Sequence, residues 1–238
     1  MKIGLFTDAH YCKSEVLGGS RYALASFEKT KASMEHFKRE GVDIVFCLGD
    51  LTDNDLNDTY LDVAENFKAI MSLIYSYDIP FYLVPGNHDY HIMKGDDIEK
   101  IGGIRIPPYT VSTSKYDFIV LDANFRESME RFDSAGVVWD DSNLPQDQVD
   151  FLEKALSSSD RKCVVLVHEN LDPSVDKRHI IKNADKIRDI ISKSGKVCMV
   201  LQGHYHPGNT NIIDDIPYIT LPAMCESSDD YFRIIELN

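Results

Sequence analysis

Five short apolar runs in this chain each end abruptly in histidine, aspartate or asparagine, and no other feature constrains the fold as strongly. The run over residues 79–84 stops at Pro85-Gly86 and is followed by Asn87, His88 and Asp89. Proline offers no amide to a β-ladder and glycine permits a sharp bend, so the run ends there. A lone Asn-His-Asp is equally compatible with a polar turn. The other four runs favour a functional site.

Those four runs have the same design. Because alternate side chains of an extended strand point the same way, Asp8 and His10 can bind one ion together. Gly49 lets the backbone approach a ligand, and the two oxygens of the Asp50 carboxylate can serve two cations. The later runs, residues 163–167 and 197–201, end in His168 and in the pair His204 and His206.

Apolar strands that alternate with helical patterns predict an α/β fold. Apolar residues recur at helical spacing around residues 24–37, 63–77, 149–156 and 180–191, between the apolar runs. Such alternation indicates a mostly parallel sheet with right-handed helical crossovers, whose strands end at one shared edge. We therefore expect one cluster at that edge, made of Asp8, His10, Asp50, Asn87, His168, His204 and His206.

The donor set predicts two metal ions. Seven nitrogen and oxygen donors without a cysteine exceed what one tetrahedral ion needs. Imidazole and carboxylate suit divalent or trivalent manganese, iron, zinc or nickel, and ligand type does not choose among them. Two cations about 3.5 to 4 Å apart can share a carboxylate and a hydroxide, and can clamp an in-line displacement at phosphorus. Phosphoester hydrolysis fits this arrangement.

The composition limits the classes of binding partner and the cellular compartment that we expect. The net charge of −14 disfavours a nucleic-acid polymer, because that binding depends on basic residues, but it leaves small phosphorylated substrates open. Five cysteines without a Cys-x-x-Cys spacing are typical of a reduced compartment. With no leader and no membrane-length apolar stretch, we expect a cytoplasmic protein with a single domain over residues 1–238 and no membrane association. The oligomeric state stays open.

These motifs, in this order, resemble the calcineurin-like metallophosphoesterase superfamily. Its pattern is Asp-x-His, Gly-Asp-x-x-Asp, Gly-Asn-His-Asp or Glu, a later histidine, and Gly-His-x-His. The resemblance implies a four-layer α/β/β/α sandwich of two mixed sheets flanked by helices. It also implies that His88 protonates the leaving oxygen and that Asp89 positions His88. One metal would be held by Asp8, His10, Asp50 and His206, and the other by Asp50, Asn87, His168 and His204.

Within the superfamily, the start Asp-x-His-Tyr and the Arg-Tyr before the first helix are similar to the manganese-dependent ADP-ribose/CDP-alcohol diphosphatase branch. The resemblance thus favours a small phosphodiester, phosphomonoester or nucleotide diphosphate. Two alternatives stay open, a protein phosphatase and a non-catalytic scaffold of the same fold. Substrate selection is expected in residues 91–108 and 125–143, which read as irregular loops, and Trp139 either packs under its loop or stacks on a base. The sequence predicts His91 and His179 outside the ligand set, and it favours a surface position for Arg21 over an approach to a bound phosphate.

Overall fold

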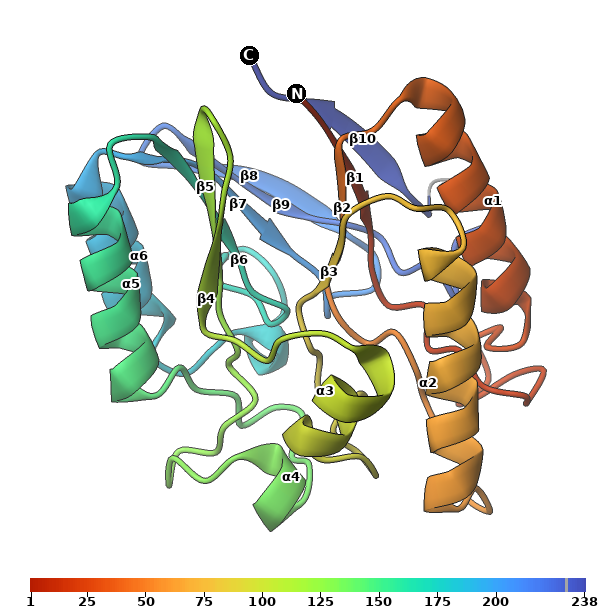
Figure 1. Cartoon of the computed structure of the whole chain (residues 1–238). Helices are drawn as coiled ribbons and strands as arrows, with labels where there is room; N and C mark the ends of the chain where they lie inside the picture. Colours follow the sequence, from red (N-terminus) through yellow and green to blue (C-terminus); the bar gives the residue numbers. More distant parts are fainter. Residues whose placement is uncertain (230) are drawn as a thin grey trace.

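Two β-sheets lie face to face with helices on their outer sides, which makes four layers (Figure 1). A computed structural model of the chain describes residues 1–229 and 231–238. The four-stranded sheet has the order β10-β1-β2-β3 and the six-stranded sheet the order β4-β5-β6-β7-β9-β8. Both sheets are mixed, because β10, β4 and β8 run antiparallel to neighbours in otherwise parallel arrays. The structure confirms the expected sandwich.

The strands are short. In the first sheet they are β1 (Lys2–Phe6), β2 (Ile44–Cys47), β3 (Phe81–Leu83) and β10 (Arg233–Glu236). In the second they are β4 (Tyr109–Ser112), β5 (Tyr116–Val120), β6 (Lys162–Leu166), β7 (Val197–Gln202), β8 (Asn209–Ile213) and β9 (Ile216–Thr220). Central strands are covered on both faces, which explains why their sequences are continuously apolar.

The predicted helices are present and cover the outer faces. Helices α1 (Ala25–Glu40) and α2 (Tyr60–Tyr75) pack on the first sheet, and α5 (Gln146–Ser158) and α6 (Ala184–Ser194) pack on the second (Figure 1). The first helix ends at Gly41, whose φ of 64° closes a left-handed cap. The second begins with a capping box between Thr59 and Asp62.

Two expectations need correction. Residues 91–108 are not wholly irregular, because α3 (Gly95–Gly102) lies within them; a helix of 8 residues is too short to show a clear period. The chain also forms shorter helical turns at α4 (Phe132–Ala135) and η1 (Lys177–His179). The strand ends do not share the edge of a single sheet, because β1, β2 and β3 belong to one sheet and β6 and β7 to the other.

The sheets meet through an apolar layer that fixes their relative position. Ile3, Phe46 and Val84 of the first sheet share one buried cluster with Phe118 and Leu201 of the second. Beyond this layer the loops that follow β1, β2, β3, β6 and β7 come together, so the polar ends of both sheets face one site. Among the described residues, no helix is both long and apolar enough to cross a bilayer.

Candidate metal centre

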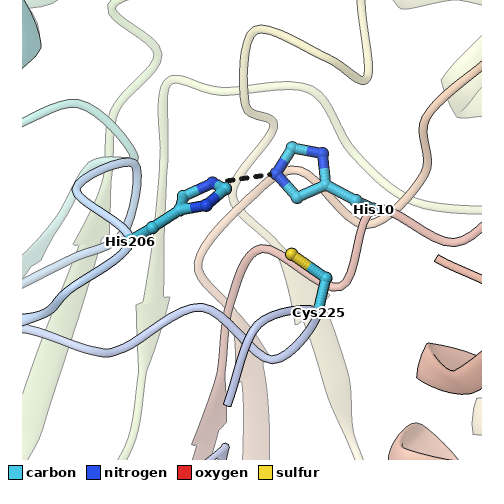
Figure 2. A group of neighbouring side chains, drawn as sticks. All are labelled: His10, His206 and Cys225. Atoms are coloured by element: carbon cyan, nitrogen blue, oxygen red, sulfur yellow. Dashed lines mark hydrogen bonds between the residues drawn. The ribbon is translucent and has the colours of Figure 1, made fainter. Parts of the chain in front are cut away.

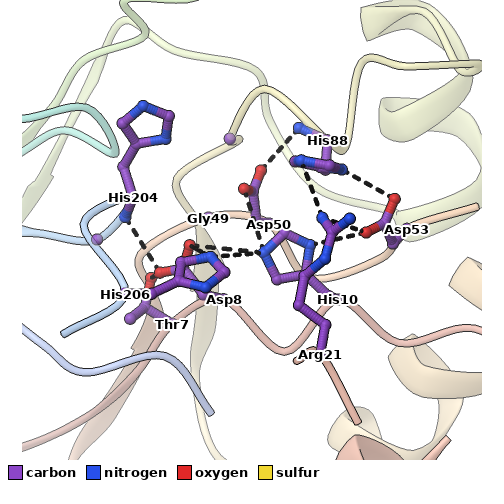
Figure 3. Close-up of polar contacts among 12 residues, drawn as sticks. Thr7, Asp8, His10, Arg21, Gly49, Asp50, Asp53, His88, His204 and His206 are labelled. Atoms are coloured by element: carbon purple, nitrogen blue, oxygen red, sulfur yellow. Dashed lines mark hydrogen bonds and ion pairs between the residues drawn. The ribbon is translucent and has the colours of Figure 1, made fainter. Parts of the chain in front are cut away.

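One group of four side chains converges from the ends of β1, β2 and β7 (Figure 3). Oδ1 of Asp8 lies 3.7 Å from Nε2 of His10 and 3.5 Å from Nε2 of His206. Nε2 of His10 lies 3.6 Å from Oδ2 of Asp50 and 3.2 Å from Nε2 of His206. Donors that bind one ion at about 2.1 Å are expected to lie at this kind of separation from one another.

A second group shares Asp50 with the first. The donor atoms of Asp50, His168 and His204 all lie within 4.8 Å of one another, and Oδ2 of Asp50 is 3.3 Å from Nε2 of His168. Asn87 lines the same cavity as Asp50 and His204. The structure therefore brings together all seven side chains that the sequence predicted as ligands, in two groups around one carboxylate.

Hydrogen bonds on the far side of three imidazoles orient them for coordination. Each histidine faces an oxygen that can only accept, so its Nδ1 carries a proton and its Nε2 is the atom that could bind a metal. The acceptors are Oδ2 of Asp53 for His10 (3.0 Å), the Leu48 carbonyl for His168 (2.6 Å) and Oε1 of Glu226 for His206 (3.0 Å).

Unpartnered buried atoms test whether the residues fit a pair of cations. A buried polar atom without a partner costs about 1–3 kcal/mol, so such atoms are normally few. Within the described part of the chain, four candidate donor atoms are buried and lack a hydrogen-bond partner: Asp8 Oδ1, Asn87 Oδ1, His168 Nε2 and His204 Nε2. One of them, Asp8 Oδ1, belongs to the first group, the other three belong to the second, and coordination would satisfy all four. The residues fit two cations.

The electrostatics of the pocket also favour added positive charge. Burial opposes ionisation of His10, yet hydrogen bonds to Asp53 and Asp8 raise the pKa of His10 to about 10. Without metal, the imidazole of His10 thus holds an extra proton, which supplies positive charge at this position. Burial, helped by the nearby His168, instead holds the pKa of His204 well below its usual value, so that ring stays neutral as a metal ligand requires.

Backbone strain gathers at the same residues. Asp8, His10, Asp50 and His204 all have positive φ, between 48° and 66°. A non-glycine residue in this region costs of the order of 1–3 kcal/mol and persists only where the surroundings hold it. The fold therefore gives up some stability to direct these four side chains inward.

A glycine is needed at position 49, because the backbone after β2 passes close to His168, which follows β6. The φ of Gly49 is +109°, and a Cβ added there would lie 2.2 Å from Nδ1 of His168. We expect Gly49→Ala to push His168 away, to lower the free energy of unfolding by about 2 kcal/mol or more, and to weaken metal binding. Chemical denaturation and elemental analysis check this. Gly19→Ala, which adds a Cβ with no atom within 4 Å, is the control for strain alone at positive φ; equal metal loss in both variants would contradict the close-approach argument.

The prediction that Asp89 positions His88 is wrong. Nδ1 of His88 bonds Oδ1 of Asp53 at 2.8 Å, not Asp89. The buried Asp89 carboxylate instead accepts the amides of Leu51, Thr52 and Gly86, at 3.0, 3.1 and 2.9 Å. These amides lie beyond the ends of β2 and β3, where no ladder partner remains, and the carboxylate binds them together. Burial and the nearby Asp50 raise the pKa of Asp89 to about 7.

Arg21 lies in the site rather than on an open surface. Its Nη1 is 2.8 Å from Oδ2 of Asp53 and donates to Nε2 of His88 at 3.2 Å. The sequence favours a surface position over this one, because Arg21 follows an irregular loop whose side-chain directions follow no period.

The loops add further side chains around a cavity of about 570 Å³. Its wall includes His91, Trp139 and His179, besides Arg21 and the candidate ligands. Trp139 is 37% exposed and lines the cavity. His91 and His179 belong to neither four-residue ligand group, as expected, yet both face the cavity. The two loops in which we expected substrate selection thus supply part of its wall.

Cys225 is a neighbour of the first group that the sequence did not indicate. Figure 2 shows it beside His10 and His206, with donor atoms of all three within 4.8 Å of one another. Burial, with Asp8 and Glu226 nearby, raises the pKa of the Cys225 thiol far above its usual range. Cys225 therefore lines the first group as a neutral thiol in the metal-free site.

The known proteins that this chain resembles are described as phosphoesterases or phosphodiesterases. A family model described as calcineurin-like phosphoesterase matches residues 1–208. A protein of Arcobacter nitrofigilis named "probable glycerophosphodiester phosphodiesterase" is 24% identical over 193 residues, which are 75% of this chain and 62% of the relative. The match therefore spans less than two thirds of that protein. A "probable cyclic nucleotide phosphodiesterase" of Fibrobacter succinogenes is 24% identical over 231 residues, 94% of this chain and 79% of the relative.

A solved structure has the same fold. The crystal structure of a dimetal phosphatase from Danio rerio superposes with a TM-score of 0.84 and covers 99% of this chain and 92% of its own. The two sequences are 17% identical, so the likeness concerns the architecture alone.

Proposed function

Because this chain belongs to the calcineurin-like phosphoesterase family, we propose that it is a binuclear-metal hydrolase of a small phosphodiester, phosphomonoester or nucleotide diphosphate. The observation that carries the proposal is the pair of donor groups that share Asp50. The non-catalytic alternative would be marked by lost ligands, and all seven are present here.

The proposed metal assignment follows the two groups. Asp8, His10, Asp50 and His206 would hold one cation, and Asp50, Asn87, His168 and His204 the other. Manganese, iron, zinc and nickel all suit these donors. When bound, the two cations would lower the pKa of water and draw charge from the phosphoryl oxygens.

His88 is the proposed general acid, and Asp53 its positioning residue. Asp53 accepts a hydrogen bond from Nδ1, so a second proton, taken up from solvent on Nε2, is the one that the ring would give to a leaving oxygen. In this structure Nε2 accepts a hydrogen bond from Arg21, so that bond must break before Nε2 can act. A phosphate oxygen is a stronger acceptor for a guanidinium than a neutral imidazole. We infer that Arg21 turns to the substrate phosphate and so frees His88.

A metal-reconstitution panel tests the proposed function. Chelator-treated protein is expected to be inactive and to regain activity with one of the four metals. The panel compares p-nitrophenyl phosphate, bis(p-nitrophenyl) phosphate, 3′,5′-cyclic AMP and ADP-ribose, with product release as the measurement. A protein that binds two metals but hydrolyses none of these would contradict the proposal, and a phosphopeptide in the same panel checks for protein phosphatase activity.

A further inference from the structure

We infer that the substrate is a nucleoside phosphodiester that binds in one direction. Its nucleoside would lie on a rim formed by Trp139, Arg178, His179 and Tyr205, and its leaving alcohol would enter a separate hollow beyond His88. This inference rests on the proposed function and adds the class and orientation of the substrate.

The rim is a continuous aromatic surface that begins at a candidate metal ligand. The ring of His204 lies 5.1 Å from that of His179 and 6.1 Å from that of Trp139, between centroids. His179 in turn lies 5.2 Å from Trp139 and 5.2 Å from Tyr205. The guanidinium of Arg178 lies 5.4 Å from the centroid of the Trp139 ring. Aromatic rings and guanidinium planes are the groups on which nucleobases stack.

The rim also holds a polar atom that has no partner within the described residues. Nδ1 of His179 is buried and makes no hydrogen bond there, although His179 lines the cavity beside Trp139. This atom is enclosed by protein, so a substrate hydroxyl does not reach it in this side-chain arrangement. The rim therefore offers stacking surfaces for a base rather than a hydrogen bond to it.

A second hollow adjoins the cavity on the other side of His88. It has a volume of about 360 Å³ and shares Arg21, His88 and His91 with the main cavity. Besides these three residues, the hollow is lined by Val16, Leu17, Gly18, Asp53, Asn54, Asp55 and Leu56. Among the described residues that line it, the only rings are the imidazoles of His88 and His91, which pack against each other with 4.4 Å between their centroids. Its carboxylates can accept hydrogen bonds from the hydroxyls of a compact alcohol.

The position of His88 between the two spaces sets the direction of binding. A general acid must contact the leaving oxygen, so the leaving alcohol lies on the side of His88 and the retained group on the side of Trp139. The oxygen of water bonds to phosphorus as the bond to the leaving oxygen breaks. That oxygen takes the proton of His88, and a proton of the attacking water passes to solvent. The products are a nucleoside monophosphate and an alcohol.

Two esters with the same leaving group isolate the contribution of the rim. Thymidine 5′-(p-nitrophenyl phosphate) and methyl p-nitrophenyl phosphate differ only in the group that stays on phosphorus. We expect Trp139→Ala to lower the ratio of their kcat/KM values about tenfold, equivalent to about 1.4 kcal/mol, mainly through KM of the nucleoside ester. Trp139→Phe should keep most of the preference. Tyr22→Ala is the matched control, because Tyr22 is 53% exposed but lines neither space.

A third ester, in which adenosine and glycerol are joined through one phosphate, tests which of the two alcohols leaves. Adenosine 5′-(glyceryl phosphate) should yield AMP and glycerol, separated by chromatography. Adenosine and glycerol phosphate as the main products would overturn the proposed orientation. An unchanged ratio of the two nitrophenyl esters in Trp139→Ala would overturn the nucleoside rim while hydrolysis itself continues. Failure of the wild-type holoenzyme to cleave any of the three diesters, with activity on p-nitrophenyl phosphate or ADP-ribose retained, would overturn the nucleoside diester as substrate. Inactivity on the whole metal-reconstitution panel as well would remove the proposed function, and the rim with it.

Discussion

Replacement of Asp50 by asparagine is expected to empty both metal positions and to lower kcat/KM by about a thousandfold or more. Oδ2 of Asp50 lies 3.6 Å from Nε2 of His10 and 3.3 Å from Nε2 of His168, so this oxygen is common to both groups. The amide keeps the shape but removes the negative charge that two cations would share. A thousandfold loss corresponds to about 4 kcal/mol of transition-state stabilisation, a reasonable size for lost metal catalysis.

Elemental analysis and steady-state kinetics on the purified variant measure the two effects separately. Asp117→Asn is the matched control, since Asp117 is also buried but bonds Ser159 and Arg161 in the second sheet. That variant should keep both metals. If Asp50→Asn retained two equivalents of metal at normal affinity, the shared carboxylate would have to be another residue. Metal retained with activity lost would place Asp50 in the reaction but not in the binding of both ions.

The ligands were predictable because each stands at the end of a regular strand. An apolar run followed by glycine and a donor, as at Gly49-Asp50 and Gly203-His204, encodes a strand, its stop and an exposed side chain in a few residues. Helices α1, α2, α5 and α6 were predictable for the same reason, since each buries one periodic face. Local sequence is sufficient for these elements because the structure follows the local pattern.

The side chains that support the ligands were predictable only in part, because the sequence favours Asp53 as a partner of the ligands or a turn residue but does not pair it with His88. Asp89 follows His88 directly and was expected to orient it, whereas Asp53, thirty-five positions earlier, does so. Neighbours in a tight turn point in different directions, and which one reaches a given ring depends on the packing of β2 against β3. Glu226, which binds His206, comes from beyond the last strand of the second sheet and carries no local signal.

The cavity wall was the least predictable part. Arg21 and Trp139 come from irregular segments and His179 from the short helical turn η1, and only the tertiary fold places them together. Their chemistry was visible in the sequence, but their direction was not, because loops lack the two-residue or 3.6-residue period that orients side chains. For the same reason substrate class has to be argued from the structure, whereas metal chemistry can be argued from the motifs.

Replacement of His88 by alanine is expected to slow the hydrolysis of alkyl esters by about a hundredfold to ten-thousandfold, the usual contribution of a general acid. The backbone amide of His88 still donates to Oδ1 of Asp50 at 2.7 Å, so metal content should be unchanged. Esters with p-nitrophenol as leaving group need little protonation and should be affected far less. The measurement is therefore kcat/KM across a series of leaving-group pKa values, in which the variant should show a steeper dependence than the wild type.

Asp53→Asn and Asp89→Asn separate the two carboxylates near His88. Asp53 bonds His88 and His10, so its amide variant should steepen the leaving-group dependence and also weaken metal binding. Asp89 bonds only backbone amides among the hydrogen bonds of the described residues, so Asp89→Asn should lower the free energy of unfolding and leave the leaving-group dependence as in the wild type. A steep dependence in Asp89→Asn with a normal one in Asp53→Asn would reverse the assignment. Equal losses for good and poor leaving groups in His88→Ala would remove His88 from the acid role.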